Sequence, residues 1–256
     1  MASLQIHQFP CLGDNYGYLV HDPDSGLTAA IDSPDAEVIR HALDERGWKL
    51  DYILNTHHHA DHAGGNLALK ASTGCTIVGA RADADRIPGI DILVGEGDHF
   101  MLGEHSARVI ETPGHTRAHI CYSFDADRVV FVGDTLFSMG CGRLFEGTPA
   151  QMWTSLQKIM QLPDETMIFC AHEYTQSNGR FALSVEPDNP ALRARMREVD
   201  ALRADNQPTV PSTLGVEKAT NPFLRPASPG LRATLGLAAA SDTEVFAETR
   251  KRKDQF

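Results

Sequence analysis

The chain has 256 residues, of which 42% are hydrophobic and 22% are charged, enough for one large domain, or one domain with a smaller appendage, around a real core. Its formal net charge is −11 at pH 7. This excess of acid argues against broad binding to nucleic acids or anionic membranes, because phosphate-rich surfaces require a basic protein face. A small anionic ligand held by a few local Lys or Arg side chains is still compatible with the charge.

The N-terminus and the cysteines indicate the compartment. The opening segment MASLQIHQFPCLGDN contains neither the basic nor the apolar part of a signal peptide, and no apolar run approaches the roughly 18 residues of a membrane span. The cysteines are odd in number, widely scattered and without a CxxC pair, which is typical of reduced thiols. We therefore expect a cytoplasmic protein that binds neither membranes nor nucleic acid.

Short strand-like runs alternate with amphipathic segments over the first two thirds of the chain, which indicates an α/β core. Turn sequences such as GDN and DPDSG separate the first runs, and Gly47 ends the first helical pattern. In chain order we predict strands at 4–9, 16–22 and 28–33, a helix at 35–47, a strand at 51–55, a helix at 64–74, strands at 76–80, 107–111, 119–124 and 128–134, a helix at 149–162 and a strand at 166–174.

The pattern changes beyond about residue 175. Segments 189–206 and 241–256 are helix-like, and a proline-rich connector containing QPTVPS and TNPFLRPASPG joins them. We predict two domains, an α/β domain over 1–174 and a mainly helical domain over 175–256.

Four histidines and an aspartate lie within THHHADH, residues 56–62, directly after the strand at 51–55. In an extended backbone alternate side chains share a face, so His57 and His59 point together while His58 points away. Asp61 and His62 lie where the chain must turn into the next helix. The segment therefore offers two candidate pairs of metal ligands.

Three further polar residues follow apolar strands, where a sheet ends in a loop: His115, Asp134 and His172. Polar residues at such positions converge from distant parts of a sequence. Six or seven nitrogen and oxygen ligands are too many for one closed tetrahedral zinc site, and no cysteine fills a ligand position. The count favours two metal ions about 3.5–4 Å apart that share a bridging carboxylate.

The segments THHHADH, TPGHT, GDTLF and AHEYT, in this order, resemble the motifs of the metallo-β-lactamase superfamily. GCGRLFEGT, TNPFLR and the terminal KDQF narrow the resemblance to the glyoxalase II, or hydroxyacylglutathione hydrolase, family over essentially the whole chain. The resemblance implies an α+β fold, an αββα sandwich of two mixed sheets flanked by helices, with a C-terminal helical domain that binds substrate.

The resemblance also implies a ligand set for two divalent ions, most often zinc and sometimes iron or manganese. One ion would be held by His57, His59 and His115. The other would be held by Asp61, His62 and His172. Asp134 would bridge the two ions together with a water or hydroxide.

Such a centre suits hydrolysis of a thioester, because two cations lower the pKa of a shared water and stabilise the oxyanion that develops during attack. Asp61 or Asp134 can orient the water, and a thiolate leaves without a dedicated general acid. Cys141, in a glycine-rich loop, is a competing nucleophile, but no paired base lies near it in the sequence.

The substrate implied by the family is S-(2-hydroxyacyl)glutathione, typically S-D-lactoylglutathione, in the second step of methylglyoxal detoxification. Glutathione carries two carboxylates, so its site requires cations. The resemblance points to Arg143 and Tyr174 near the metals and to Arg250 and Lys253 further away, which share a helix face at a spacing of three. Phe145 lies where some members of the family have Tyr, so the hydrogen bond made by that Tyr is absent here. The basic residues at 250–253 have an alternative role, because cations in the last turn of a helix complement the helix dipole.

Other functions on the same scaffold stay open at this point. A persulfide dioxygenase would use one iron held by two histidines and a carboxylate, and tends to lack the long C-terminal helical region. A lactamase or lactonase would not need Arg250 and Lys253. We find no self-complementary surface in the sequence and expect a monomer.

Overall fold

The computed structural model describes residues 2–256, which separate into two compact units. Unit 1 comprises the residues up to Glu111 together with Ala118–Gly133, and unit 2 comprises Thr112–Arg117 together with Asp134–Phe256. These contact-based units divide the chain differently from the predicted domains, since the segment from Asp134 to Tyr174 belongs to unit 2. Within residues 2–256, every helix is too short or too polar to span a membrane.

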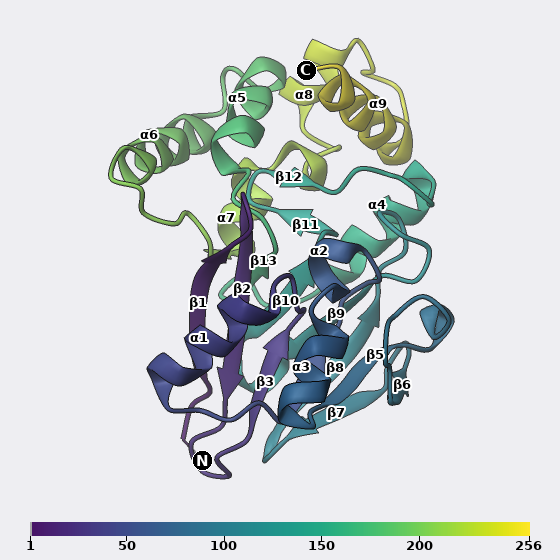
Figure 1. The fold of residues 1–256 in the computed structure, drawn as a ribbon. Helices are drawn as coiled ribbons and strands as arrows, with labels where there is room; N and C mark the ends of the chain where they lie inside the picture. Colours follow the sequence, from purple (N-terminus) through teal and green to yellow (C-terminus); the bar gives the residue numbers. More distant parts are fainter. Residues whose placement is uncertain (1) are drawn as a thin grey trace. The chain divides into compact units, whose positions relative to one another are not determined.

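Unit 1 contains two sheets and the helices of the N-terminal half (Figure 1). Its strands are β1 (Gln5–Cys11), β2 (Asn15–His21), β3 (Thr28–Ile31), β4 (Tyr52–Leu54), β5 (Thr76–Ala80), β6 (Ile92–Val94), β7 (His99–Leu102), β8 (His105–Glu111), β9 (Ile120–Phe124) and β10 (Val129–Gly133). Its helices are α1 (Ala36–Arg46), α2 (Ala60–Ala63) and α3 (Asn66–Thr73).

The first sheet is mixed and runs in the order β1-β2-β3-β4-β5-β6. Its first three strands are antiparallel and its last four are parallel, with β3 in both sets. The other sheet of unit 1 places β10, β9, β8 and β7 side by side in antiparallel pairs. Parallel strands need crossover connections, and α1 and α3 supply them on one face of the first sheet (Figure 1).

Helix α1 shows why the sequence folds this way locally. Asp35 caps its N-terminus by accepting hydrogen bonds from the amides of Glu37 and Val38, and Gly47 ends it in the left-handed region at φ 67°. The predicted apolar face, which includes Ile39 and Leu43, packs into the core between the helices and the first sheet.

The two sheets of unit 1 face each other through aromatic side chains. Tyr18 of β2 packs on Phe131 of β10 at 5.5 Å between ring centroids, and Tyr52 of β4 meets Phe100 of β7 edge to face at 5.0 Å. Tyr122 of β9 is fully buried and donates a hydrogen bond to the Asn55 carbonyl at 3.0 Å. This bond anchors the chain at the start of the histidine-rich segment.

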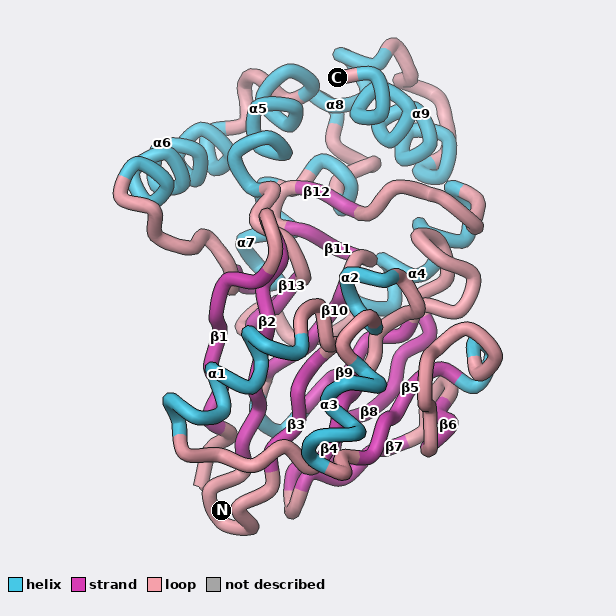
Figure 2. The backbone as a smooth tube through the Cα atoms, in the orientation of Figure 1, coloured by secondary structure: helices cyan, strands magenta, loops and turns pink. Residues whose placement is uncertain are grey.

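Unit 2 is mainly helical (Figure 2). Its strands are β11 (Leu136–Phe137), β12 (Gly140–Cys141), β13 (Met167–Cys170) and β14 (Ser212–Thr213). Its helices are α4 (Pro149–Ile159), α5 (Thr175–Val185), α6 (Pro190–Ala204), α7 (Leu214–Thr220), α8 (Pro229–Leu235) and α9 (Asp242–Gln255).

Most predicted elements are present, and the differences have local causes. The proline-rich connector contains two helices, α7 and α8. In α8, Pro229 stands at the first helical position, where a missing N–H costs nothing. Ser228 caps the same helix. Helix α5 and the short strands β6 and β7 also lie outside the predicted elements.

The buried hydroxyl of Tyr122 supports a stability prediction. Tyr122→Phe removes the hydrogen bond to Asn55 and leaves that buried carbonyl with one donor fewer, so we expect a loss of about 1–2 kcal/mol in the free energy of unfolding. Denaturant unfolding followed by circular dichroism measures this loss. Tyr52→Phe is the matched control, since Tyr52 contacts Phe100 through the ring that Phe retains. Equal stability of the two variants would contradict the anchoring role of Tyr122.

Candidate metal centre and substrate-binding residues

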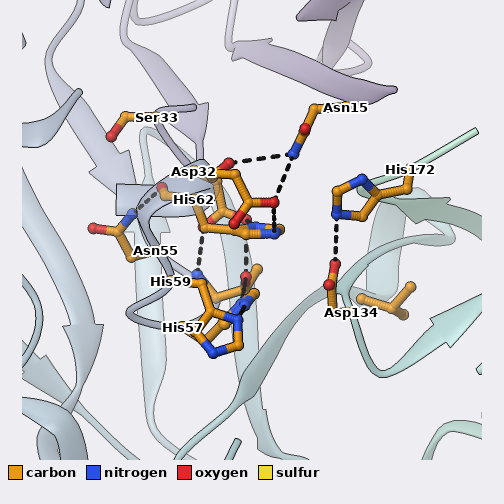
Figure 3. A network of polar contacts seen from close by, with 12 residues as sticks. Asn15, Asp32, Ser33, Asn55, His57, His59, His62, Asp134 and His172 are labelled. Atoms are coloured by element: carbon orange, nitrogen blue, oxygen red, sulfur yellow. Dashed lines mark hydrogen bonds and ion pairs between the residues drawn. The ribbon is translucent and has the colours of Figure 1, made fainter. Parts of the chain in front are cut away.

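Unit 1 brings together the four candidate ligands of the histidine-rich segment. His57 Nε2 lies 3.1 Å from His59 Nδ1, and His62 Nε2 lies 3.4 Å from a carboxylate oxygen of Asp61. The rings of His57 and His62 are 4.0 Å apart. Helix α2 begins at Ala60, as the predicted turn into a helix requires, and His62 of this helix lies beside His57 (Figure 3).

Asp32, at the end of β3, organises this half of the site. Its carboxylate accepts hydrogen bonds from the Thr56 amide at 2.7 Å and hydroxyl at 2.8 Å, and lies 2.8 Å from His62 Nδ1 (Figure 3). A carboxylate accepts, so Nδ1 of His62 carries the proton and Nε2 keeps its lone pair for a metal. Asp32 adopts φ 58°, an uncommon conformation for a residue other than glycine.

Two asparagines orient the neighbouring groups in unit 1. Asn15 donates to the Asp61 carboxylate and carbonyl, both at 3.3 Å, and Asn55 donates to the His62 carbonyl at 2.9 Å (Figure 3). Both asparagines are buried. The carboxylate and imidazole of this pair are therefore placed by fixed hydrogen bonds.

His58 faces away from the ligand pairs, as the alternation of an extended chain predicts. Its Nδ1 lies 3.1 Å from the buried carboxylate of Asp83, and its Nε2 lies 3.2 Å from Arg86. Arg86 also pairs with Asp83. His58 thus ties the peptide between His57 and His59 to the segment after β5.

Unit 2 brings together the other three candidate ligands. The Asp134 carboxylate lies 3.4 Å from His115 Nε2 through one oxygen and 3.3 Å from His172 Nε2 through the other. Figure 3 shows the contact between Asp134 and His172. All three residues are nearly fully buried. An aspartate between two imidazoles, with one oxygen for each, is the geometry of a carboxylate able to bridge two ions.

The β11–β12 hairpin follows Asp134 and ends beside His115. His115 Nδ1 lies 2.9 Å from the Arg143 carbonyl, which can only accept, so Nδ1 carries the proton and Nε2 is the metal-binding nitrogen. Gly142 has to be glycine, because a Cβ there would lie 2.0 Å from the Asp134 carbonyl. The Arg143 backbone therefore has a role that does not involve its side chain.

Aromatic rings flank two of these histidines. Tyr174 stacks on His172 with 4.8 Å between ring centroids, and Phe145 meets His115 edge to face at 5.2 Å. Phe145 is 63% exposed, which is unusual for a large apolar side chain. It has no hydroxyl to offer a ligand, whereas Tyr174 has one.

The predicted cations lie in unit 2 and differ in environment. Arg250 is buried, donates to the Cys141 carbonyl at 2.8 Å and pairs with Asp254 at 2.9 Å. Lys253 is half-buried and lies near the ring of Phe181. Burial, together with the positive charges of Arg250 and Arg143, lowers the pKa of Lys253, and Asp254 offsets this only in part.

Cys141 does not have the environment of a nucleophile. Burial raises the pKa of its thiol to about 11, against the opposing effect of Arg250, so the thiol is protonated at neutral pH. The expectation that Cys141 is not the reacting group agrees with this environment.

The residues fit a metal centre by their chemistry. The candidate ligands are imidazoles and carboxylates, each offering one ligand atom, without a thiolate. Asp32 and the Arg143 carbonyl hold Nδ1 of His62 and His115, which is how proteins fix metal-binding histidines. The candidate ligands of each unit therefore have contacts of the kind that support a metal-binding histidine.

Comparisons with known proteins identify the family. Residues 24–172 match the model of the metallo-β-lactamase superfamily, and residues 173–256 match that of the hydroxyacylglutathione hydrolase C-terminus. The chain is 58% identical to the hydroxyacylglutathione hydrolase of Maricaulis maris (strain MCS10) over 256 residues, 100% of each chain. It is 58% identical to that of Methylococcus capsulatus (strain ATCC 33009 / NCIMB 11132 / Bath), over 99% of each chain.

Among solved structures, ETHE1 from Myxococcus xanthus is similar, with a TM-score of 0.69 and 26% identity over 96% of this chain and 90% of that one. The predicted metallo-β-lactamase fold with a C-terminal helical region is confirmed. The chain belongs to the metallo-β-lactamase superfamily and, within it, to the hydroxyacylglutathione hydrolase family. This membership implies a dinuclear metal site.

Sequence reasoning missed Asp32, Asn15 and Asn55. Asp32 ends an apolar strand in TAAIDS just as Asp134 ends VVFVGD, and this shared position is the signal that points to it. Asn15 and Asn55 carry no comparable signal, because their roles depend on contacts with residues 46 and 7 positions away along the chain.

Asp32→Asn tests the supporting role of Asp32. The Thr56 amide and His62 Nδ1 bond to different oxygens of Asp32, and an amide side chain accepts at only one of these positions, so it cannot serve both and we expect metal affinity to fall by about 10- to 100-fold. Competition with a chromogenic chelator measures this affinity. Asp91→Asn is the matched control, because Asp91 bonds to a backbone amide of the same sheet and to Lys70 but to no histidine. Equal metal affinity of the two variants would refute the role.

Proposed function

We propose that the chain hydrolyses S-(2-hydroxyacyl)glutathione, typically S-D-lactoylglutathione, to glutathione and a 2-hydroxy acid such as D-lactate. The observation that carries the proposal is the position of Asp134 between the Nε2 atoms of two histidines. This geometry suits two metal ions that share the Asp134 carboxylate. Membership of the hydroxyacylglutathione hydrolase family supports the thioester substrate. Residues 1–174 would form the catalytic domain and 175–256 the mainly helical domain that binds substrate.

In this proposal the chain binds two divalent ions, with zinc as the first candidate and iron or manganese as alternatives. The ligands of one ion are His57, His59 and His115. The ligands of the other are Asp61, His62 and His172. Asp134 would contribute one carboxylate oxygen to each ion. When bound, such ions lower the pKa of water towards neutrality and polarise the carbonyl of a thioester.

The chain's own residues account for the other requirements of hydrolysis. Asp61, which Asn15 holds in place, and Asp134 can each orient the attacking water by accepting its hydrogen bond. Glutathione leaves as a thiolate, whose pKa of about 8.5 makes a dedicated proton donor unnecessary. The high pKa of Cys141 keeps that thiol out of the reaction.

The cations of unit 2 support an anionic substrate. Lys253 has a lowered pKa because it is partly buried and because Arg250 and Arg143 repel its charge, and a carboxylate of glutathione would offset this repulsion. We propose that these three cations and the Tyr174 hydroxyl contact the substrate, with Lys253 as a partly exposed cation at the C-terminal end. Arg250 would act partly through the Cys141 carbonyl, to which it donates.

The cellular compartment and the oligomeric state are part of the same proposal. All five cysteines are buried thiols, which supports a reducing, cytoplasmic environment. We propose that the chain acts as a monomer. Sedimentation at the concentrations used for kinetics tests this state.

Removal of the metals tests the proposed reaction. Exhaustive chelation should abolish hydrolysis of S-D-lactoylglutathione, and His59→Ala or Asp134→Ala should lower kcat by more than about 100-fold, beyond the cost of losing a supporting contact. Metal analysis should find about two ions per wild-type chain and fewer in both variants. His99→Ala, which removes an exposed histidine bonded to Ser106, should retain both properties.

Full activity after removal of the metals would overturn this mechanism. Oxidation of glutathione persulfide with one iron per chain, in place of thioester hydrolysis, would instead indicate the dioxygenase alternative.

The charge of Lys253 provides a separate test of the substrate. Lys253→Ala should raise KM for S-D-lactoylglutathione about fivefold, equivalent to about 1 kcal/mol for a partly exposed charge, with little effect on kcat. Arg252→Ala is the matched control, because Arg252 has the same charge on the same helix but pairs with Glu248. A single substitution is preferable to removal of residues 250–256, which also takes away the bond from Arg250 to Cys141.

The lowered pKa of Lys253 predicts that KM rises with pH. Lys253 loses its proton at a pH below the ordinary lysine value of 10.5, so KM for an anionic substrate should rise as pH increases through that lowered pKa. Lys253→Arg retains the charge, and its KM should stay flat over the same range. A parallel rise in both proteins would show that Lys253 does not bind the substrate.

A further inference from the structure

The β11–β12 hairpin of unit 2 links two candidate metal ligands. It begins just after Asp134, and its last strand leads to Arg143, whose carbonyl holds His115 Nδ1 at 2.9 Å. Gly142 donates back to the Thr135 carbonyl at 3.4 Å, which closes the base of the hairpin. The path of this hairpin therefore determines where the Arg143 carbonyl lies and which nitrogen His115 presents to a metal.

The hairpin does not hold its shape by itself. Its tip residue Met139 adopts φ 55°, which is unfavourable for any residue other than glycine. Each strand has only two residues, and a two-stranded hairpin of any length is marginally stable alone. Contacts from elsewhere in unit 2 must stabilise it.

Glu217 of α7 supplies the central contact. It is fully buried, and both of its carboxylate oxygens accept two hydrogen bonds each. One oxygen accepts from the hydroxyls of Ser138 at 3.1 Å and Ser212 at 2.6 Å. The other accepts from the Met139 amide at 2.8 Å and the Asn221 side chain at 3.1 Å. Two of these four donors belong to the hairpin tip.

Side chains from three helices or their ends hold the carbonyls of the hairpin. Asn221, at the end of α7, donates to the carbonyls of Phe137 at 3.1 Å and Gly140 at 2.9 Å. Asn178 of α5 donates to the Ser138 carbonyl at 3.1 Å, and Arg250 of α9 donates to that of Cys141. A segment with so many of its backbone groups bonded to the C-terminal region takes its conformation from that region.

We propose that Glu217 is a positioning residue for the hydrolase, and this inference rests on the proposed metal-dependent function. Through the tip of the β11–β12 hairpin, Glu217 sets the position of the Arg143 carbonyl, and through that carbonyl the ring orientation and tautomer of His115. It touches neither substrate nor metal. The C-terminal region thus completes the metal centre in addition to binding the substrate.

Two substitutions separate the hydrogen bonds of the Glu217 side chain from its negative charge. In Glu217→Gln the amide oxygen can face the Met139 and Asn221 donors, while the amide nitrogen faces the serine hydroxyls, which rotate to accept. All four contacts survive this change. In Glu217→Ala none survives, and the buried Met139 amide is left without this acceptor.

The test compares metal retention and kinetics in these variants. We expect Glu217→Ala to lose about one of two metals per chain during dialysis against a chelator that leaves the wild type loaded, and to lower kcat at least tenfold with KM nearly unchanged. Glu217→Gln should stay within about threefold of the wild type in both measurements. Glu186→Ala is the matched control, because Glu186 is a buried carboxylate of the same unit that pairs with Arg225 and Ser228.

Equal metal loss in Glu217→Ala and Glu186→Ala at a similar fall in Tm would overturn the proposal, since general destabilisation would then explain both. If Glu217→Ala does not fold, Asn221→Ala removes the donor to Phe137 and Gly140 while Glu217 stays, and should show the same metal loss; full retention there would equally overturn it. Metal retention is read without substrate, so absence of thioester hydrolysis in the wild type would refute the proposed function separately.

Discussion

An imidazole binds a metal through one ring nitrogen, and the protein has to hold the other. This constraint applies to the candidate ligands of each unit. In unit 1 the Asp32 carboxylate holds His62 Nδ1, and in unit 2 the Arg143 carbonyl holds His115 Nδ1. Each partner can only accept, so each leaves Nε2 with its lone pair. The candidate ligands are thus oriented by hydrogen bonds to residues outside the candidate ligand set.

Backbone strain near these partners follows from the same constraint. Asp32 at φ 58° and Met139 at φ 55° are both in the left-handed region, where a residue other than glycine is unfavourable. Such conformations persist only where surrounding contacts over-determine them. Asp32 receives three contacts from Thr56 and His62, and the Met139 amide is held by Glu217. The strained residue of unit 1, Asp32, contacts the candidate ligand His62 directly. The strained residue of unit 2, Met139, lies in the β11–β12 hairpin, which leads to the carbonyl that contacts His115.

The sequence indicates the grouping of the candidate ligands more clearly than it indicates the residues that contact them. Alternation along a strand is enough to pair His57 with His59 and to turn His58 away, and the position at a strand end marks Asp134 and His172. The structure reproduces both patterns within each unit. Glu217 could not be found in this way, because its importance depends on contacts with a hairpin almost 80 residues earlier, at 78 and 79 positions of separation. The helix that carries it, α7, lies in a segment whose prolines predict a connector, although Thr213 caps the N-terminus of this helix.

The charge distribution explains how an acidic chain can select an anionic substrate. A formal charge of −11 sets the long-range field, but binding depends on the charges within a few ångströms of the ligand. Burial, together with the positive charges of Arg250 and Arg143, lowers the pKa of Lys253, even with Asp254 beside them. A carboxylate bound among the cations would offset the repulsion between them. The same acidic exterior disfavours larger polyanions, because these would also contact the negatively charged surface. A small anion would contact mainly the local cations.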